Sequence, residues 1–231
     1  GVGSSGPSAP TNAVTPAGLP AAPGNVFATA QDRQATVSWS PPDSNGAPIS
    51  GYAVTTYTPS GSTGPPIQVS GATTIVTGLA GSTSYYFVVS AISATGTGPG
   101  STSSNIAVPY DRQQADTWMT ENLGDFLTTR DQAPEPYNWN ADGCSVVRNF
   151  DPVWAEIFRE TCYRHDFGYR NYGNGIRMQR DDQTRLWIDN QLRTDMVNYC
   201  DDHVLLGPDC YGRAEEYYLG VRNLAESAFY A

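Results

Sequence analysis

The chain has 231 residues, a formal net charge of −10 and 13 basic residues, every one of which is arginine. Because a strongly acidic surface repels phosphate, we do not expect this chain to bind nucleic acid or a strongly anionic membrane. No apolar run in the sequence approaches the ~20 residues that a membrane-crossing helix needs.

The composition changes abruptly near residue 110, which predicts two domains. Before this point the charged side chains are Asp32, Arg33 and Asp43, among many Gly, Ser, Thr, Pro and Val residues. The remaining charged residues and all four cysteines follow it. The cysteines, which can pair in three ways, are Cys144, Cys162, Cys200 and Cys210. An even number of cysteines in a short acidic domain is typical of two disulfides, so we expect a secreted, extracellular protein.

Residues 1–22 are small and polar without a hydrophobic period, and we expect a flexible linker there. Residues 23–109 contain short alternating segments between turn residues, at the spacing typical of an antiparallel β-sandwich. The expected strands span residues 26–28, 35–39, 51–57, 74–76, 85–91 and 104–108. Because the aromatic residues alternate within these strands, we expect them in the core and not on an exposed carbohydrate-binding surface.

Several details of this segment resemble a fibronectin type III domain. They are Trp39 followed by Ser40-Pro41-Pro42, the run Ile49-Ser50-Gly51-Tyr52, and the run from Thr83 to Ala91. The resemblance implies an all-β immunoglobulin-like sandwich with Trp39 in the core and Tyr85 as a corner tyrosine that bonds back to the backbone. The segment contains no His and no Cys, so we predict a module that binds a polysaccharide or protein ligand and has no catalytic site of its own.

Residues 110–231 predict a compact all-α domain cross-linked by disulfides. Asp151 followed by proline is typical of a helix start, and the glycines that follow Tyr172 are typical of a helix end. The expected helices span residues 111–130, 152–173, 182–199 and 209–229.

The chemistry is concentrated in the segment Glu160–Tyr172. At helical spacing, one face of this segment carries a cysteine, a titratable base, a carboxylate and a phenol. These residues are Cys162, His165, Asp166 and Tyr169. A neutral histidine can act as a general base when a second group fixes its tautomer. Considered alone, however, a histidine beside an aspartate on a helix is more often a structural pair.

A disulfide between Cys144 and Cys162 would bring two carboxylates together. Asp142 lies two residues before the first cysteine, and Asp166 lies one helical turn after the second. With a loop carbonyl such as that of Gly143, they would form an oxygen-only ligand set, which suits calcium.

A disulfide between Cys200 and Cys210 would orient the helix that carries Asp189. This aspartate lies eleven residues, almost three whole turns, before Cys200, so the two share one helix face. Asp189 could then reach His165 and fix its tautomer.

The run from Cys162 to Tyr172 closely resembles the active-site helix of the secreted phospholipases A2 of the prokaryotic and fungal type. The similarity extends over roughly residues 136–231. It implies hydrolysis of the sn-2 ester of a glycerophospholipid at a membrane surface or micelle, and we expect a monomer. The resemblance assigns catalysis to His165 and Asp189, Ca²⁺ ligation to Asp142, Gly143 and Asp166, and the disulfides to Cys144–Cys162 and Cys200–Cys210.

Two other interpretations compete with this one. First, two Cys-x-x-His pairs, Cys162 with His165 and Cys200 with His203, could hold zinc tetrahedrally. That arrangement would leave Cys144 and Cys210 unpaired. Second, the chain could be an adhesion or ligand-binding protein whose helical half is inactive, although both candidate catalytic residues are present.

Overall fold

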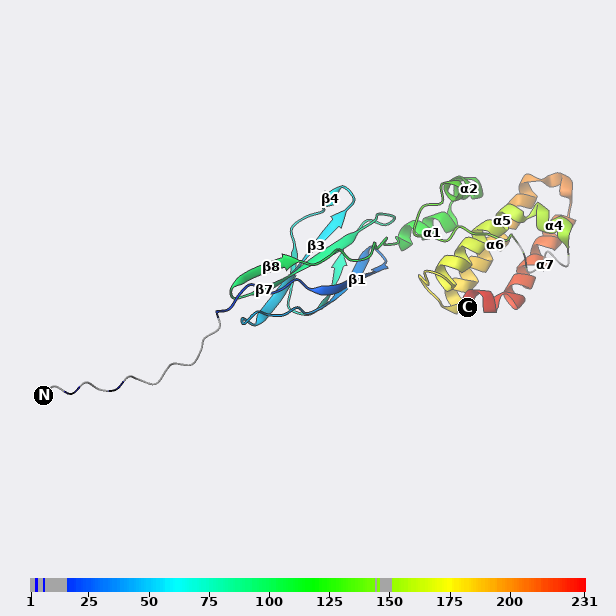
Figure 1. The fold of residues 1–231 in the computed structure, drawn as a ribbon. Helices are drawn as coiled ribbons and strands as arrows, with labels where there is room; N and C mark the ends of the chain where they lie inside the picture. The colour runs from blue at the N-terminus through cyan, green and yellow to red at the C-terminus, as the bar shows by residue number, and fades with distance from the viewer. Residues whose placement is uncertain (1–2, 4–5, 7–15, 144, 146–150) are drawn as a thin grey trace. The chain divides into compact units, whose positions relative to one another are not determined.

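The structure, a computed structural model, describes residues 3, 6, 16–143, 145 and 151–231. It divides into two compact units, one built of strands and the other mainly of helices (Figure 1). The first unit comprises residues 1–29, 36–76 and 84–107, and the second comprises residues 30–35, 77–83 and 108–231. Among the helices in the described ranges, none is both long and apolar enough to cross a bilayer.

The strand unit contains two sheets. The three-stranded sheet has the order β1-β2-β6, with β1 Gly24–Gln31, β2 Gln34–Ser40 and β6 Thr73–Thr77. The five-stranded sheet has the order β4-β3-β7-β8, and β5 also pairs with β3. Its strands are β3 Ile49–Thr58, β4 Gly61–Ser62, β5 Ile67–Val69, β7 Tyr86–Ser93 and β8 Gly96–Gly100. The pairings of β3 and β7 are antiparallel.

Alternation within the strands places the apolar side chains inside. In β7, Phe87, Val89 and Ala91 are fully buried, whereas the residues between them are partly exposed. Trp39 is buried, and its ring packs edge to face on Tyr52 with centroids 5.2 Å apart. The all-β fold predicted for this half is therefore confirmed, with Trp39 in the core.

The strand expected at residues 104–108 is wrong. This segment forms only an isolated bridge between Ala107 and Tyr85. The physical reason is that the side chain of Asn105, and not the backbone of this segment, makes the hydrogen bonds to β1. The Asn105 amide oxygen accepts from the Ala28 N–H at 2.8 Å, and the Asn105 amide nitrogen donates to the Ala28 carbonyl at 2.9 Å.

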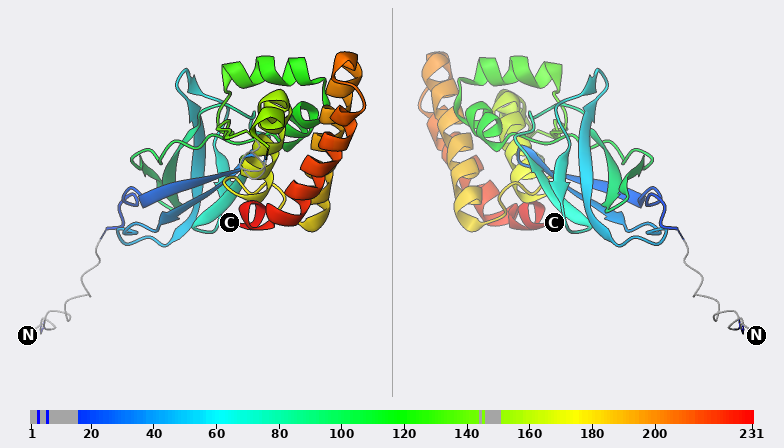
Figure 2. Two further views of the ribbon diagram at one scale, coloured as in Figure 1. Left: turned by 90° about the vertical axis from the view of Figure 1, so that its right-hand side faces the viewer. Right: turned by 90° about the vertical axis from the view of Figure 1, so that its left-hand side faces the viewer.

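The second unit is helical, as predicted. Its elements are α1 Arg112–Thr120, α2 Leu123–Gln132, α4 Pro152–Ile157, α5 Arg159–Gly168, the π-helix η1 Tyr169–Gly173, α6 Asp182–Asp202, the 3-10 helix η2 Val204–Leu206, α7 Asp209–Leu224 and α8 Glu226–Tyr230. Helices α6 and α7 pack side by side (Figure 2).

Three of the expected helices are interrupted. The helix predicted over residues 111–130 is two helices, because the Asn122 side chain accepts from the Asp125 N–H at 2.9 Å and starts α2. The helix predicted over 152–173 breaks at Phe158 and continues past Gly168 as a π-helix. The last helix is divided at Ala225 into α7 and α8.

Helices α5 and α6 approach each other closely at Gly168. A Cβ atom at this position would lie 2.7 Å from Cγ2 of Ile188, which is fully buried. The absence of a side chain at Gly168 therefore lets Ile188 pack against the backbone of α5. The residue after Ile188 is Asp189, so this contact sets how near Asp189 comes to α5.

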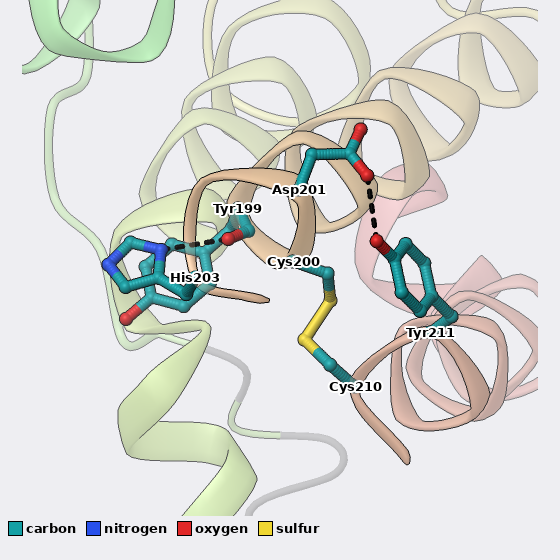
Figure 3. The surroundings of a disulfide bond; sticks show 6 residues. All are labelled: Tyr199, Cys200, Asp201, His203, Cys210 and Tyr211. Atoms are coloured by element: carbon teal, nitrogen blue, oxygen red, sulfur yellow. Dashed lines mark hydrogen bonds between the residues drawn. A yellow bond between two sulfur atoms is a disulfide. The ribbon is translucent and has the colours of Figure 1, made fainter. Parts of the chain in front are cut away.

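A disulfide between Cys200 and Cys210 joins the end of α6 to the start of α7, as the resemblance implies (Figure 3). The Cα atoms of the two cysteines are 5.8 Å apart. Cys162 is also disulfide-bonded. Cys144 lies outside the described residues, so its pairing with Cys162 stays a prediction.

Candidate active site

His165 on α5 and Asp189 on α6 are in direct contact. His165 Nε2 lies 2.8 Å from Asp189 Oδ1, and both residues are buried, Asp189 completely. The two residues are 24 positions apart in the sequence. The contact therefore depends on the packing of α5 against α6.

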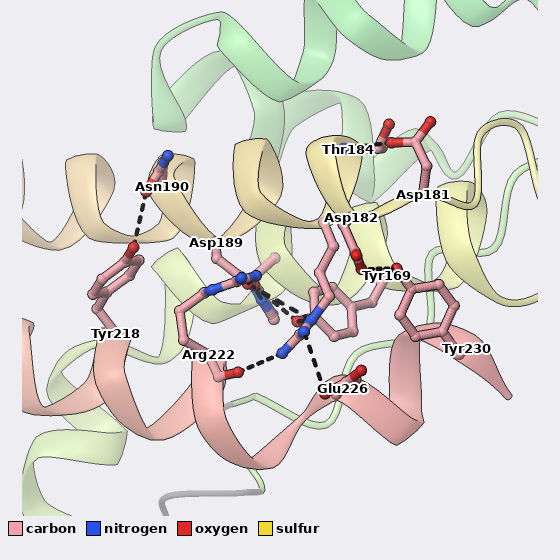
Figure 4. A network of polar contacts seen from close by, with 12 residues as sticks. Tyr169, Asp181, Asp182, Thr184, Asp189, Asn190, Tyr218, Arg222, Glu226 and Tyr230 are labelled. Atoms are coloured by element: carbon pink, nitrogen blue, oxygen red, sulfur yellow. Dashed lines mark hydrogen bonds and ion pairs between the residues drawn. The ribbon is translucent and has the colours of Figure 1, made fainter.

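Asp189 is surrounded by donors. The Tyr169 hydroxyl donates to Oδ1 at 2.8 Å, and Arg222 Nη1 on α7 donates to Oδ2 at 2.7 Å (Figure 4). Burial would raise the pKa of Asp189, but the hydrogen bonds from His165, Arg222 and Tyr169 outweigh burial and leave this pKa below its ordinary value. Asp189 is therefore a carboxylate at neutral pH.

The charge of Asp189 fixes the histidine tautomer. A carboxylate only accepts hydrogen bonds, so Nε2 of His165 carries the proton in this contact. In the neutral imidazole, Nδ1 is then the basic nitrogen. The His165 ring also packs on the Tyr169 ring, with centroids 4.2 Å apart, which holds the plane of the imidazole.

Arg185 makes further polar contacts with Tyr169, Asp189 and Arg222. Its Nε donates to the Tyr169 hydroxyl at 3.3 Å and lies 3.9 Å from Asp189 Oδ2. Its Nη2 donates to the backbone carbonyl of Arg222. Sequence reasoning missed both arginines. Arg185 lies one helical turn before Asp189 and was recognisable in principle, whereas Arg222 lies 33 residues away from Asp189.

The second group of predicted residues meets at Asp166. The backbone N–H groups of Asp142 and Gly143 both donate to Asp166 Oδ2 at 2.9 Å. Gly143 has a φ of 60°, in the left-handed region that glycine adopts without strain. The loop therefore folds its backbone directly onto the carboxylate that follows His165.

Asn171 anchors this loop from the π-helix. Its amide oxygen accepts from the Asn138 N–H at 2.8 Å, and its amide nitrogen donates to the Asn138 carbonyl at 2.9 Å and to the Phe167 carbonyl at 2.8 Å. Asn171 is fully buried. The position of the loop before Asp142 is thus fixed by η1, and no spacing along the chain predicts this contact.

Asp142, His165 and Asp166 all line one cavity of about 260 Å³. Its other walls include the apolar residues Leu192, Val221, Ala225 and Ala228. The lining thus combines a polar part, which contains His165 and the two carboxylates, with an aliphatic part.

The donor set in the polar part fits a hard cation such as calcium. Burial raises the pKa of Asp166, and the neighbouring carboxylate of Asp142 raises it further, against the N–H groups that lower it. A divalent cation held by the two carboxylates would stabilise their charged forms and so lower the pKa of Asp166. In the described part of the chain, no three His, Cys, Asp or Glu side chains converge to hold a metal by themselves. Carbonyl or water oxygens would have to complete the coordination.

Arg170 supplies a cation in this part of the cavity. Its Nη2 lies 3.4 Å from Asp142 Oδ2, and both side chains are partly exposed. The guanidinium offsets part of the repulsion between the two carboxylates. Because this pair is exposed to water, it holds Asp142 only weakly.

The alternative zinc set does not assemble. The Cys200 sulfur is bonded to Cys210 and is not available as a thiolate ligand. His203 is exposed, and its ring stacks on Tyr199 with centroids 3.9 Å apart. The Cys₂His₂ hypothesis is therefore wrong.

A histidine–carboxylate pair at a cavity, beside two further carboxylates, is typical of a hydrolase that activates water. Comparison with known proteins agrees with this class. Residues 115–225 match the family model described as prokaryotic phospholipase A2, and residues 21–107 match that of the fibronectin type III domain.

Two curated relatives are each named secretory phospholipase A2. One, from Beauveria bassiana (strain ARSEF 2860), is 40% identical over 101 residues, which are 43% of this chain and 50% of that protein. The other, from Arthroderma benhamiae (strain ATCC MYA-4681 / CBS 112371), is 30% identical over 114 residues, which are 47% of this chain and 74% of that protein. The chain thus spans half the length of the first relative and about three quarters of the second. It belongs to the prokaryotic-type phospholipase A2 family.

Solved structures similar to the chain include a crystal structure of domains from titin. It is 24% identical with a TM-score of 0.38, and the match covers 40% of this chain and 33% of that one. The twitchin kinase region from C. elegans is 21% identical with a TM-score of 0.39, over 41% of this chain and 17% of that one. These low scores carry no conclusion about function.

Proposed function

We propose that this protein is a secreted, calcium-dependent phospholipase A2 that hydrolyses the sn-2 ester of glycerophospholipids to a fatty acid and a lysophospholipid. The observation that carries the proposal is the 2.8 Å contact between His165 Nε2 and the fully buried Asp189. Family membership and the printed names of the two relatives support the reaction class and secretion.

His165 acts as the general base. Its Nδ1 accepts a proton from the attacking water, while Nε2 keeps its proton in the hydrogen bond to Asp189. Asp189 holds the ring orientation and stabilises the imidazolium that forms. Tyr169 and Arg222 hold the carboxylate in turn, because each donates to a different oxygen of Asp189.

Asp142, Gly143 and Asp166 are the residues that would hold calcium. When bound, the ion supplies positive charge that binds the substrate phosphate and polarises the ester carbonyl. The N–H groups of Asp142 and Gly143 donate to Oδ2 of Asp166, so Oδ1 is the oxygen that Asp166 would offer to the ion.

The aliphatic wall of the cavity suits the acyl part of a lipid. Leu192, Val221, Ala225 and Ala228 offer no charge to that side of the cavity, and burial of an acyl chain there is favoured by about 25 cal/mol for each Å² removed from water. The substrate would thus lie with its phosphate toward Asp142 and its chain toward α7 and α8.

The test is release of labelled fatty acid from the sn-2 position of phosphatidylcholine vesicles, with calcium and with excess chelator. We expect release only with calcium, and a loss of at least about 10³-fold for His165→Ala, because the variant lacks the base. The matched control is His203→Ala, which removes the exposed histidine of the same domain and should keep full activity on dispersed short-chain phosphatidylcholine. Equal activity in chelator would refute the calcium assignment, and full activity of His165→Ala would refute the mechanism.

The sandwich supports a separate proposal. We propose that it binds a polysaccharide or protein ligand; it has its own core and lacks His and Cys, so it would take no part in hydrolysis. The rival view of an inactive helical half requires a broken site, and the contact between His165 and Asp189 argues against it. The lack of a basic stripe argues against nucleic acid as a partner.

A further inference from the structure

The turn between α6 and α7 carries the two most exposed large apolar side chains of the described residues. Leu205 is 100% exposed and Val204 is 75% exposed, and they are neighbours in η2. A single exposed leucine is ordinary on a protein surface. Two consecutive aliphatic side chains that are 75% and 100% exposed at the apex of a turn form a small apolar surface that an external partner could cover.

This turn, which we call the η2 loop (residues 203–208), is rigid. The Cys200–Cys210 disulfide closes its base. Within it, the Leu206 N–H donates to the His203 carbonyl at 2.9 Å, and the Gly207 N–H donates to the Val204 carbonyl at 3.2 Å. Val204 and Leu205 are therefore held outward by a closed, hydrogen-bonded turn. A preformed loop loses little conformational entropy when it binds.

The sides of the η2 loop are aromatic and acidic. Tyr211 is 43% exposed, and its hydroxyl donates to Asp201 Oδ1 at 2.8 Å, while His203 stacks on Tyr199 (Figure 3). Asp202 is exposed next to this stack. Such amphipathic rings suit the boundary between hydrocarbon and water.

The charges around the loop select the kind of lipid. Acidic side chains repel an anionic headgroup, but they attract the outward-facing choline cation of phosphatidylcholine. Aromatic faces also attract quaternary ammonium groups. The net charge of −10 for the whole chain favours the same choice.

We propose that the η2 loop is a membrane anchor, in which Val204 and Leu205 insert into a zwitterionic phosphatidylcholine surface while the acidic and aromatic side chains meet its choline groups. The proposal rests on the proposed function, since a phospholipase works on aggregated lipid. The anchor stands at the end of the helix that lines the cavity. Leu192 in the cavity wall lies eight residues before Cys200, about 12 Å along α6.

The test measures partition of the full chain onto phosphatidylcholine vesicles by co-sedimentation in excess chelator, so that no turnover is needed. We expect the double variant Val204→Ser/Leu205→Ser to bind at least about tenfold more weakly, because it loses most of the apolar area that would be buried. The control is Leu219→Ser, which removes an apolar side chain that is 48% exposed on α7 and should leave binding unchanged. Phosphatidylglycerol vesicles should bind the unmodified protein more weakly than phosphatidylcholine vesicles.

Hydrolysis of a dispersed short-chain phosphatidylcholine, below its micelle-forming concentration, separates the two proposals. The double variant should keep the kcat/KM of the unmodified protein there. If the unmodified protein releases no fatty acid from either dispersed or vesicular phosphatidylcholine in the presence of calcium, the proposed function fails, while the binding result in chelator still stands. Equal vesicle binding by the double variant would overturn the anchor. So would tighter binding to phosphatidylglycerol, or a dimer in lipid-free solution that the double variant abolishes, because the partner would then be a second copy of this chain.

Discussion

At the scale of single residues, the site depends on the hydrogen bonds that keep the buried carboxyl group of Asp189 ionised. Asp189 is completely buried and meets His165, Tyr169 and Arg222 through separate hydrogen bonds. A carboxylate that loses a charged donor in such a place becomes easier to protonate, and a protonated Asp189 no longer stabilises an imidazolium.

Replacement of Arg222 with methionine should therefore lower activity. We expect kcat to fall about tenfold or more, with Arg222→Lys recovering part of it, because lysine restores the charge without the guanidinium geometry. Arg193→Met is the control, since Arg193 makes a surface ion pair with Glu215. Steady-state kinetics on dispersed substrate measures the effect, and an unchanged kcat in Arg222→Met would contradict it.

A second buried pair, Arg164 with Asp195, governs stability and not chemistry. Arg164 Nη1 lies 3.3 Å from Asp195 Oδ1, and both side chains are almost inaccessible. Burial raises the pKa of Asp195 to about 6, although the charge of Arg164 opposes this. The unfolded chain would have a pKa near ~3.9 for this group. The folded state therefore binds the proton more tightly, and this contribution to stability is present below about pH 4 and lost as the pH rises through about 6.

We expect the unfolding free energy of the unmodified protein, relative to that of Asp195→Asn, to fall by roughly 2 kcal/mol between pH 4 and 7. The comparison with the variant removes the contributions of the other carboxylates. Urea unfolding at several pH values measures it. Parallel curves for the two proteins would show that Asp195 does not titrate in this range.

At the scale of elements, the contact between α5 and α6 decides whether the site exists. Gly168 lets Ile188 pack against the α5 backbone, and the adjacent Asp189 then reaches His165. The substitution Gly168→Ala would place a Cβ atom 2.7 Å from Ile188, so α6 must shift.

For Gly168→Ala we expect a loss of about 1–3 kcal/mol in stability from overpacking, together with a marked fall in kcat. Gly212→Ala on α7 is the matched control. No atom lies within 4 Å of its added Cβ, so the usual helix preference for alanine should stabilise the protein by up to about 1 kcal/mol. Thermal unfolding and kinetics on both variants test this. A Gly168→Ala protein as active as the parent would mean that α6 is not held by this contact.

The helical positions show what the sequence could predict and what it could not. The spacing of Cys162, His165 and Asp166 within one helix is local, so it was readable without coordinates. Asp189 could be placed because it shares a helix face with Cys200. By contrast, Arg222 and Asn171 act across long stretches of chain, and no periodicity marks a residue that bonds to a distant partner.

The breaks between elements were also missed, for a related reason. Hydrophobic spacing continues across Asn122 and Phe158, so it predicts unbroken helices. The structure stops the helices there through side-chain caps and backbone turns that carry no periodic signal. The same holds for residues 104–108, where the Asn105 side chain replaces a strand.

At the scale of the whole molecule, the cross-links and the sandwich belong to different units. All four cysteines lie in residues 144–210, whereas the strand unit has a core of its own. Units with separate cores tend to unfold separately.

Reduction should therefore lower the melting temperature of the helical unit and leave that of the sandwich unchanged. The loss of a native disulfide typically costs 2–4 kcal/mol, which is a large shift for a small helical unit. Calorimetry with and without reductant, with circular dichroism to identify the helical transition, measures this. One transition that moves as a whole on reduction would show that the two units unfold together.

The π-helix η1 has a consequence for anyone who moves this pocket to another scaffold. Four of its five residues are buried, and a π turn holds an extra residue compared with an α turn. Deleting one position from Tyr169–Gly173 would restore ordinary winding but would remove one of the side chains that this wider turn presents. Transplantation would succeed only if the supernumerary residue were copied along with the reactive groups.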